Sequence, residues 1–201
     1  MISAMKRNKI ERNSSGERFA QLARLGEGVF HTQDIANLWN IHNPNTLHTT
    51  LSRYVQSGLL HRIYKGLYAV DTVSNIDPYL LGVKALHAPA YISCESVLFD
   101  NGLINQRPQA ITLMSRTAKQ FSIREHQFRS RKLSDEFLFN DAGIETTNGV
   151  RRATPPRAVA DMLHVYPQKH LDAKNSSLID WRAVRNIATR VGYTIETLPR
   201  V

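Results

Sequence analysis

Between residues 45 and 56, side chains that can hydrogen-bond to the edges of nucleic-acid bases recur at helical spacing. Asn and Gln can pair with both edge groups of adenine, Arg can do the same with guanine, and Thr can touch a thymine methyl group or a phosphate. At about 100° per residue these side chains fall on one helix face. The face consists of Asn45, Thr46, Thr49, Ser52, Arg53 and Gln56. It has no acidic residue, and this chemistry suits the major groove of a duplex.

The order of these residues along the helix suggests separate roles. In helix-turn-helix proteins the N-terminal part of the recognition helix faces the base edges. We therefore expect Asn45, Thr46 and Thr49 to read bases, and Arg53 and Gln56 to contact bases or backbone. Taken alone, this polar face would equally suit an ordinary solvent-exposed helix.

The next segment, "LLHRIYKGLYAV", has the pattern of a β-hairpin whose tip is the dipeptide "KG". A two-residue turn there predicts that Tyr64 pairs with Leu67 and that Ile63 pairs with Tyr68. Lys is not a favoured first residue of such a turn, so a three-residue loop is the alternative.

Either turn leaves two cations, Arg62 and Lys65, close to the hairpin tip. There they could contact phosphates or the minor groove. The sequence from residue 47 to residue 70 contains no Asp or Glu. Helix face and hairpin together favour a nucleic-acid partner.

The residues before the hairpin predict the frame that would hold these side chains. A first helix is expected from Ser14 to about Gly26, a short second helix with Thr32 as its N-cap, and a third from about Asn45 to Ser57. Three helices followed by a hairpin predict a winged helix-turn-helix domain over residues 14–73. The residues expected to face inward on the third helix are Leu47, Leu51, Tyr54 and Val55.

Beyond the turn-rich stretch "DTVSNIDP", the pattern changes to that of a mixed α+β domain over residues 78–201. Helices are predicted in "PYLLGVKALH", after Ser93, after Thr154 and after Asp180. The β-like segments are "AYIS", "AITLMS", "KQFSIREHQF" and "EFLFN". The predicted fold class is therefore α+β: an N-terminal winged helix-turn-helix followed by a mixed α+β domain.

Composition limits the class of protein. The 201 residues carry a formal net charge of +9, and a basic protein favours a polyanionic partner. No apolar run approaches the roughly 20 residues of a membrane-spanning helix, and the N-terminus lacks the apolar centre of a signal peptide. The single Cys94 fits a reducing compartment. We expect a cytoplasmic protein.

Residues typical of enzymes are sparse. Cys94 is expected to pack as a small apolar residue, because nothing in the spacing brings a base near it. The eight histidines form no metal-binding motif, and no phosphate-binding glycine loop is present. Asp135, Glu136 and Asp141 could serve a nuclease metal, but a solvated loop explains them as well. We expect no enzymatic activity, no cofactor and no metal.

A second basic segment contains Arg151, Arg152 and Arg157. It could extend a DNA footprint or hold an acidic partner. The alternative is an ordinary helix start in which Arg157 pairs with Asp161, four residues later.

Several blocks, in order, resemble the AbiEi-type antitoxins of type IV toxin–antitoxin systems: "GEGVFHTQDIA", "LSRYVQSGLLHRIYKGLYAV", "AYISCESVLFDNGLI", "ITLMS" and "RRATPPRAVADML". The similarity runs from about Leu25 to Leu163. The winged-helix part alone is shared by many regulators. The "YIS-ES-L-GLI" and "ATP-RA-AD-L" blocks narrow the match.

The resemblance implies a bacterial protein that binds double-stranded operator DNA through its winged helix and represses its own operon. It implies that the second domain counteracts a co-encoded nucleotidyltransferase-like toxin without a stable complex. It identifies no antitoxic residue, and the chain is short for this family. A stand-alone winged-helix regulator with an effector-sensing second domain is therefore the alternative.

Overall fold

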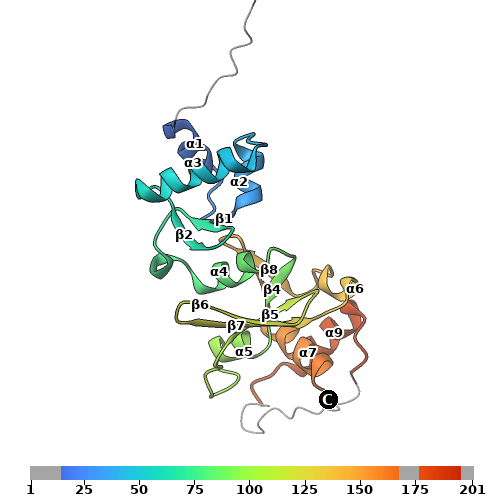
Figure 1. Ribbon diagram of the computed structural model, residues 1–201. Helices are drawn as coiled ribbons and strands as arrows, with labels where there is room; N and C mark the ends of the chain where they lie inside the picture. Colours follow the sequence, from blue (N-terminus) through green and yellow to red (C-terminus); the bar gives the residue numbers. More distant parts are fainter. Residues whose placement is uncertain (1–14, 168–176, 196–201) are drawn as a thin grey trace, which may run out of the picture. The chain divides into compact units, whose positions relative to one another are not determined.

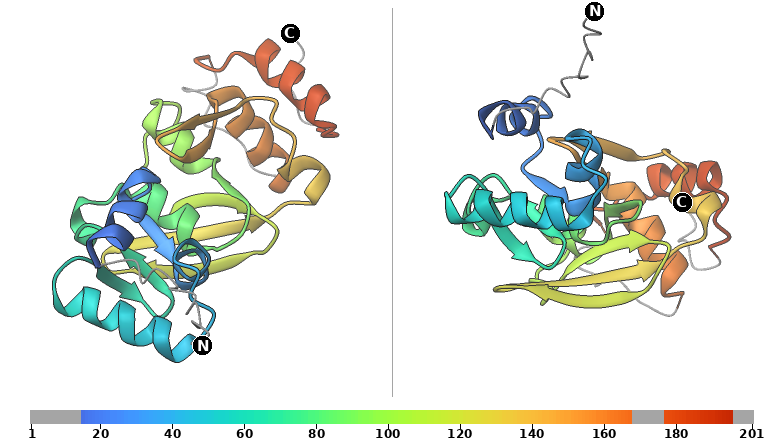
Figure 2. Two further views of the ribbon diagram at one scale, coloured as in Figure 1. Left: turned by 90° about the horizontal axis from the view of Figure 1, so that it is seen from above. Right: turned by 45° about the horizontal axis from the view of Figure 1, so that its top comes forward.

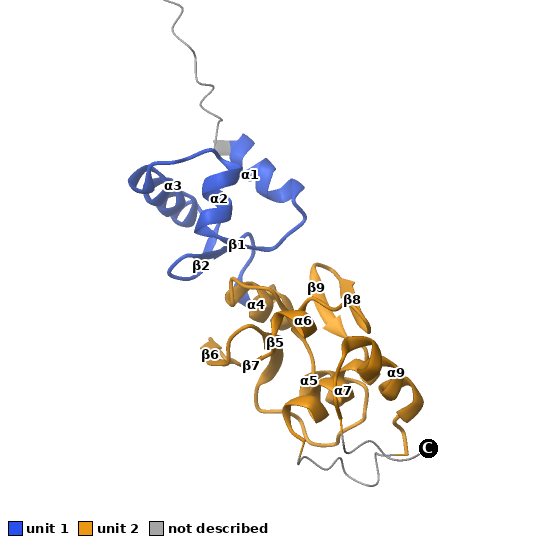
Figure 3. Cartoon of the chain, turned by 90° about the vertical axis from the view of Figure 1, so that its right-hand side faces the viewer, with its two compact units in different colours: residues 1–73 blue, residues 74–201 orange. Residues whose placement is uncertain are grey.

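The computed structural model describes residues 15–167 and 177–195 (Figure 1). The chain divides into two compact units, one ending at Val73 and the other beginning at Ser74 (Figure 3). The sequence-based bounds were residues 14–73 and 78–201.

The first unit combines three helices with a small antiparallel sheet. Its elements are α1 (Ser15–Arg24), β1 (Val29–His31), α2 (Thr32–Leu38), α3 (Pro44–Gln56), β2 (His61–Tyr64) and β3 (Leu67–Ala69). The strand order is β1-β3-β2, with β3 antiparallel to both neighbours. This order of elements and this strand pairing are those of a winged helix-turn-helix domain. Strand β1 was absent from the prediction, because three buried residues are too few to show a period.

Local chemistry fixes both ends of α3. The side chain of Asn43 is the N-cap and accepts hydrogen bonds from the backbone N–H groups of Asn45 and Thr46. Pro44 occupies the first turn, where its missing N–H costs nothing. Gly58, just past the end, has φ +73°, a conformation that glycine adopts without strain.

The inward face of α3 is as predicted: Leu47, Leu51 and Tyr54 are buried and Val55 is half-buried. The Tyr54 ring lies 5.1 Å from that of Trp39, centroid to centroid. The Trp39 indole N–H donates to the backbone carbonyl of Arg18 on α1, 3.1 Å away. These contacts join the three helices into one core.

The cap of α2 differs from the prediction. His31, not Thr32, holds the N-cap position, and its backbone N–H donates to the Asp34 carboxylate at 3.2 Å. Because β1 runs directly into α2, the last strand residue takes the extended conformation that an N-cap needs.

The wing, β2–β3, is partly as predicted. Tyr64 pairs with Leu67, but Arg62, not Ile63, lies opposite Tyr68. The register shifts at Ile63, as in a β-bulge, so the predicted Ile63–Tyr68 pair is wrong.

The second unit is built on a six-stranded mixed sheet in the order β6-β7-β5-β4-β9-β8 (Figure 2). Two of its neighbouring pairs, β4 with β9 and β5 with β7, are parallel. The strands are β4 (Ala90–Ile92), β5 (Ile111–Ser115), β6 (Lys119–Ile123), β7 (His126–Lys132), β8 (Ile144–Thr147) and β9 (Val150–Ala153). The helices are α4 (Pro78–Ala85), α5 (Glu95–Asp100), α6 (Asp135–Leu138), α7 (Pro155–Val165) and α9 (Trp181–Val191), and a 3-10 helix, η1 (Val73–Asn75), lies at the boundary of the units.

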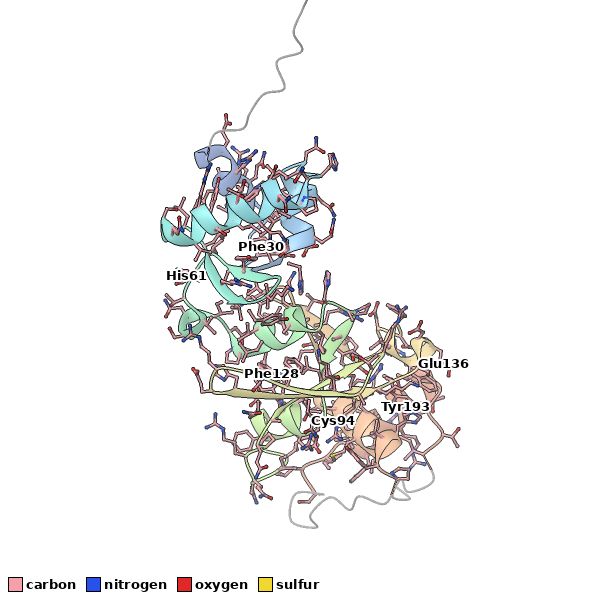
Figure 4. All side chains as sticks on the ribbon, in the orientation of Figure 1. Phe30, His61, Cys94, Phe128, Glu136 and Tyr193 are labelled. Atoms are coloured by element: carbon pink, nitrogen blue, oxygen red, sulfur yellow. The ribbon has the colours of Figure 1, made fainter. Side chains whose placement is uncertain are left out.

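Helices cover both faces of this sheet. Helix α4 lies on one face, and α5 and α7 lie on the other (Figures 1 and 3). On the α4 face, a Cβ added at Gly82 would lie 2.5 Å from the buried ring of Phe128, which is labelled in Figure 4. Helix α9 packs against α7.

Two predictions for this unit are wrong in detail. The segment "EFLFN" forms α6 and its end, not a strand, because Ser134 begins a helical turn there. Ser93 does not cap α5; Cys94 holds that position, and the Ser93 hydroxyl donates to Asp161 instead. The hairpin β8–β9 was not predicted at all.

The mixed α+β class is confirmed, with a three-stranded antiparallel sheet among the N-terminal helices and a six-stranded mixed sheet after it. Among the helices described, none combines the length and apolarity that crossing a membrane requires.

Candidate nucleic-acid interface

The outer face of α3 carries all six predicted side chains, and all six are exposed. Asn45, Thr49, Ser52 and Gln56 follow one another at intervals of three or four residues, so they form a single stripe along the helix. Arg53 and Thr46 lie at one margin of that stripe. The stripe therefore presents amide, hydroxyl and guanidinium groups together.

His48 belongs to the same surface, although sequence reasoning passed over it. It is exposed on α3, four residues before Ser52 and three after Asn45, and so flanks the stripe on the side opposite Arg53. Its position in the helical period was the signal that could have found it.

The wing places Arg62 and Lys65 on its surface, both exposed. Tyr64, an exposed aromatic residue, lies between them in sequence. The prediction from sequence gave it only a role as the strand partner of Leu67. Partial burial raises the pKa of Tyr64 above its ordinary value of 10.0.

The wing tip is tied to the helix-turn-helix by a backbone contact. The N–H of Thr32, the first residue of α2, donates to the Gly66 carbonyl at 2.9 Å. Gly66 itself has φ +92°, which a residue with a side chain would adopt only under strain. The positions of Arg62 and Lys65 relative to α2 are thus set by the fold of the unit.

The sign of the charge is uniform across these elements. Helix α3 and strands β2 and β3 contain Arg53 and Arg62 and no Asp or Glu, and Lys65 lies in the turn. A surface of this kind attracts a polyanion and loses that attraction as salt is added.

The second basic segment, by contrast, is engaged within its own unit. Arg152 pairs with Asp100, its Nη2 lying 2.7 Å from Oδ2, and Arg151 pairs with Asp141. The predicted pair between Arg157 and Asp161 is also present, but both side chains are fully buried, which the sequence did not indicate.

All five N–H donors of Arg157 have acceptors. Its Nε donates to the Asp161 carboxylate at 2.8 Å. Its Nη1 donates to the carbonyls of Asn140 and Ala142, and its Nη2 to the Phe137 carbonyl and the Tyr91 hydroxyl. A guanidinium has five such donors, so nothing of Arg157 is left for a ligand.

The buried carboxylate of Asp161 also has several hydrogen-bond donors around it. It accepts hydrogen bonds from the hydroxyls of Tyr91, Ser93 and Tyr193, at 3.1, 2.6 and 2.6 Å (Tyr193 is labelled in Figure 4). Burial lowers the pKa of Arg157, but Asp161, Tyr91 and Tyr193 together raise it by more, so the guanidinium stays charged. The cluster joins β4, α7 and Tyr193, two residues past the end of α9, and its role is structural.

Two of the three carboxylates that could serve a nuclease metal are engaged in separate ion pairs. Asp135 forms a two-pronged ion pair with Arg116, at 2.7 and 2.9 Å, and Asp141 pairs with Arg151. Within residues 15–167 and 177–195, no group of three His, Cys, Asp or Glu side chains could hold a metal ion.

Cys94 occupies a strained turn from strand β4 into α5, with φ +52° and ψ −132°. Such a turn can present a nucleophile. Here, however, the thiol is fully buried, with its sulfur 3.8 Å from that of Met114. Burial raises the pKa of Cys94 well above 9.0, which disfavours the reactive thiolate. The expectation that Cys94 packs as an apolar residue is confirmed.

The sequence matches no protein-family model, and no curated protein matches it.

Proposed function

We propose that this protein is a sequence-specific DNA-binding repressor, in which α3 reads the major groove and the β2–β3 wing grips the backbone or minor groove. One observation carries the proposal. The eight side chains chosen for DNA chemistry are all exposed on α3 and the wing, whereas Leu47, Leu51 and Tyr54 between them are buried. If α3 were only a solvent-exposed helix, nothing would require the adjoining β2–β3 hairpin to carry positive charge as well, as it does at Arg62 and Lys65.

The family resemblance extends this proposal to a biological role. The protein would act in the bacterial cytoplasm as an antitoxin that represses its own toxin–antitoxin operon. Its functional partner would be a nucleotidyltransferase-like toxin with which it forms no stable complex. A gene for such a toxin beside this one supports that role, and its absence favours a stand-alone regulator.

A mobility-shift assay with the DNA upstream of the gene tests the DNA-binding function. We expect a shifted band that survives a large excess of unrelated duplex, because base contacts add several kcal/mol to non-specific binding, on the order of 4–10. If neither this DNA nor selection from genomic fragments yields a site bound more tightly than random duplex, the repressor proposal fails.

A further inference from the structure

A basic groove lies in the second unit, where the edge strand β6 and its neighbour β7 meet the end of α7. Its volume is about 630 Å³, within the range of about 300–1,000 Å³ typical of small-molecule sites. The lining includes Lys119, Gln120, Arg129, Arg131, Lys132 and Tyr166. Among the residues described, four cations and no acidic side chain line it.

Strand register brings three of these donors to one face of the sheet. Gln120 on β6 lies directly opposite Arg129 on β7. Arg131 is two residues further along β7, so its side chain leaves the same face. Gln120 and Arg129 are exposed, whereas Arg131 is buried beside them. The groove thus has a fixed cation at its inner end and adaptable donors at its mouth.

Arg131 is held in place by two contacts. Its Nη2 donates to the Glu95 carboxylate at 2.9 Å, and its guanidinium lies 4.3 Å from the centroid of the Tyr166 ring. The residue is only 8% exposed. Its Nε has no hydrogen-bond partner among the described residues. A buried donor without an acceptor is unfavourable, and an anion entering the groove is an acceptor that a small adjustment could bring to it.

The charge of the groove indicates the ligand. Glu95 offsets the charge of Arg131, which leaves that of Arg129 on the same face to be met by an incoming group. Lys119 and Lys132 also line the groove, but their strand positions alternate to the other face of the sheet. The planar fork of Arg matches the geometry of phosphate oxygens, and Lys adds compact charge.

We propose that this groove binds a small phosphorylated ligand, with Arg129 and Gln120 donating to phosphate oxygens and Arg131 lying fixed behind them. The site lies within the second unit and would give that unit a ligand of its own. A nucleic-acid backbone fits less well, because it is tracked by rows of exposed cations, whereas the guanidinium at the inner end of this groove is enclosed.

Calorimetric titration of the full chain with inorganic pyrophosphate, at constant ionic strength and without DNA, tests the proposal. We expect saturable binding at one site per chain. Arg129→Gln removes a charged donor from an exposed position and should weaken binding at least about tenfold while leaving the fold intact. Gln120→Ala should weaken it in the same direction, because it removes the donor that lies opposite Arg129.

Arg107→Gln is the matched control, since it removes one exposed cation from the same unit outside the groove. It should leave pyrophosphate affinity within about twofold. Equal weakening by Arg107→Gln and Arg129→Gln, or a titration that does not saturate, would mean an adventitious ion only and would overturn the proposal. So would loss of duplex binding in Arg129→Gln without any pyrophosphate binding, because the groove would then belong to the DNA footprint.

Discussion

Arg157 and Asp161 face each other across one turn of α7, with Nε and Oδ1 2.8 Å apart and both side chains fully buried. Taking two charges out of water is unfavourable unless each is fully hydrogen-bonded, and here each is. The pair therefore fixes where β4, α7 and the end of α9 meet, through the tyrosines that share it.

Asp161→Asn should destabilise the second unit strongly. The change leaves the Arg157 charge buried without a counter-charge, and breaking such a pair costs about 3–5 kcal/mol. Urea unfolding measures the effect. Asp135→Asn, which removes an exposed carboxylate paired with Arg116, is the control and should unfold at the wild-type midpoint. A wild-type midpoint for Asp161→Asn would show that the cluster does not hold the unit together.

Gly82→Ala should also destabilise this unit, for a steric reason. The added Cβ would lie 2.5 Å from the Phe128 ring, which is buried and stacked on Phe121. Overpacking of this kind costs about 1–3 kcal/mol. Calorimetry should show a lower Tm. Gly16→Ala in α1 is the matched control, because its Cβ would meet nothing within 4 Å and should stabilise the helix slightly.

Asn45→Ala should reduce affinity for the cognate operator by about 1–3 kcal/mol and relax base preference at one position. The reason is loss of an amide that could pair with both edge groups of adenine. Binding to a panel of single-base operator variants measures it. Thr50→Ala is the control, because the Thr50 hydroxyl donates to the Thr46 carbonyl within α3. A loss spread evenly over all operator variants would remove Asn45 from base reading.

Arg62→Gln and Lys65→Gln should weaken binding to every duplex to a similar degree. Each lost phosphate contact releases about one counterion fewer, so the slope of log K against log salt should fall by about 0.9 per variant. Titrations at several salt concentrations give the slope. Arg107→Gln removes the same charge from the second unit and should leave the slope unchanged. An unchanged slope in both wing variants would mean that the wing does not touch phosphate.

Stability should fall as the pH is lowered through about 6.5, in part through His164. Its ring lies stacked on Tyr193, with the centroids 4.1 Å apart, and burial lowers its pKa below the ordinary value of 6.5. The unfolded chain therefore binds the proton more readily than the folded chain, so this contribution is fully present above pH 6.5 and is lost below it. We expect the urea midpoint to differ less between pH 5 and pH 8 in His164→Phe than in the wild-type protein. If the substitution leaves the difference between the two midpoints unchanged, His164 does not contribute to it.

The sequence predicted α3 well because its signals are local. The apolar positions Leu47, Leu51 and Tyr54 repeat at helical spacing, and glycine follows the last turn. The exposed stripe is simply the remainder of that pattern. The bulge at Ile63 was not foreseen, because half-buried and exposed residues alternate regularly along His61–Tyr64 and nothing in that pattern marks the shift of register.

The core of the second unit could not be predicted in the same way, because its determinants are distant in the chain. Arg157 is hydrogen-bonded to Tyr91, 66 positions away, and Asp161 is hydrogen-bonded to Tyr193, 32 positions away. From sequence, only the spacing of four between Arg157 and Asp161 was visible, and that spacing is usual for exposed helix pairs. "EFLFN" was misassigned because a short apolar run has no readable period.

The position of β4 has a consequence for how the protein is made. This early strand lies between β5 and β9 in the sheet, and its tyrosine and the serine after it are bonded to Asp161. During translation β4 must therefore wait for about sixty further residues to emerge from the ribosome, whereas the winged helix is complete once Val73 has left the exit tunnel. A nascent chain would then carry a finished winged-helix unit before its second unit has closed.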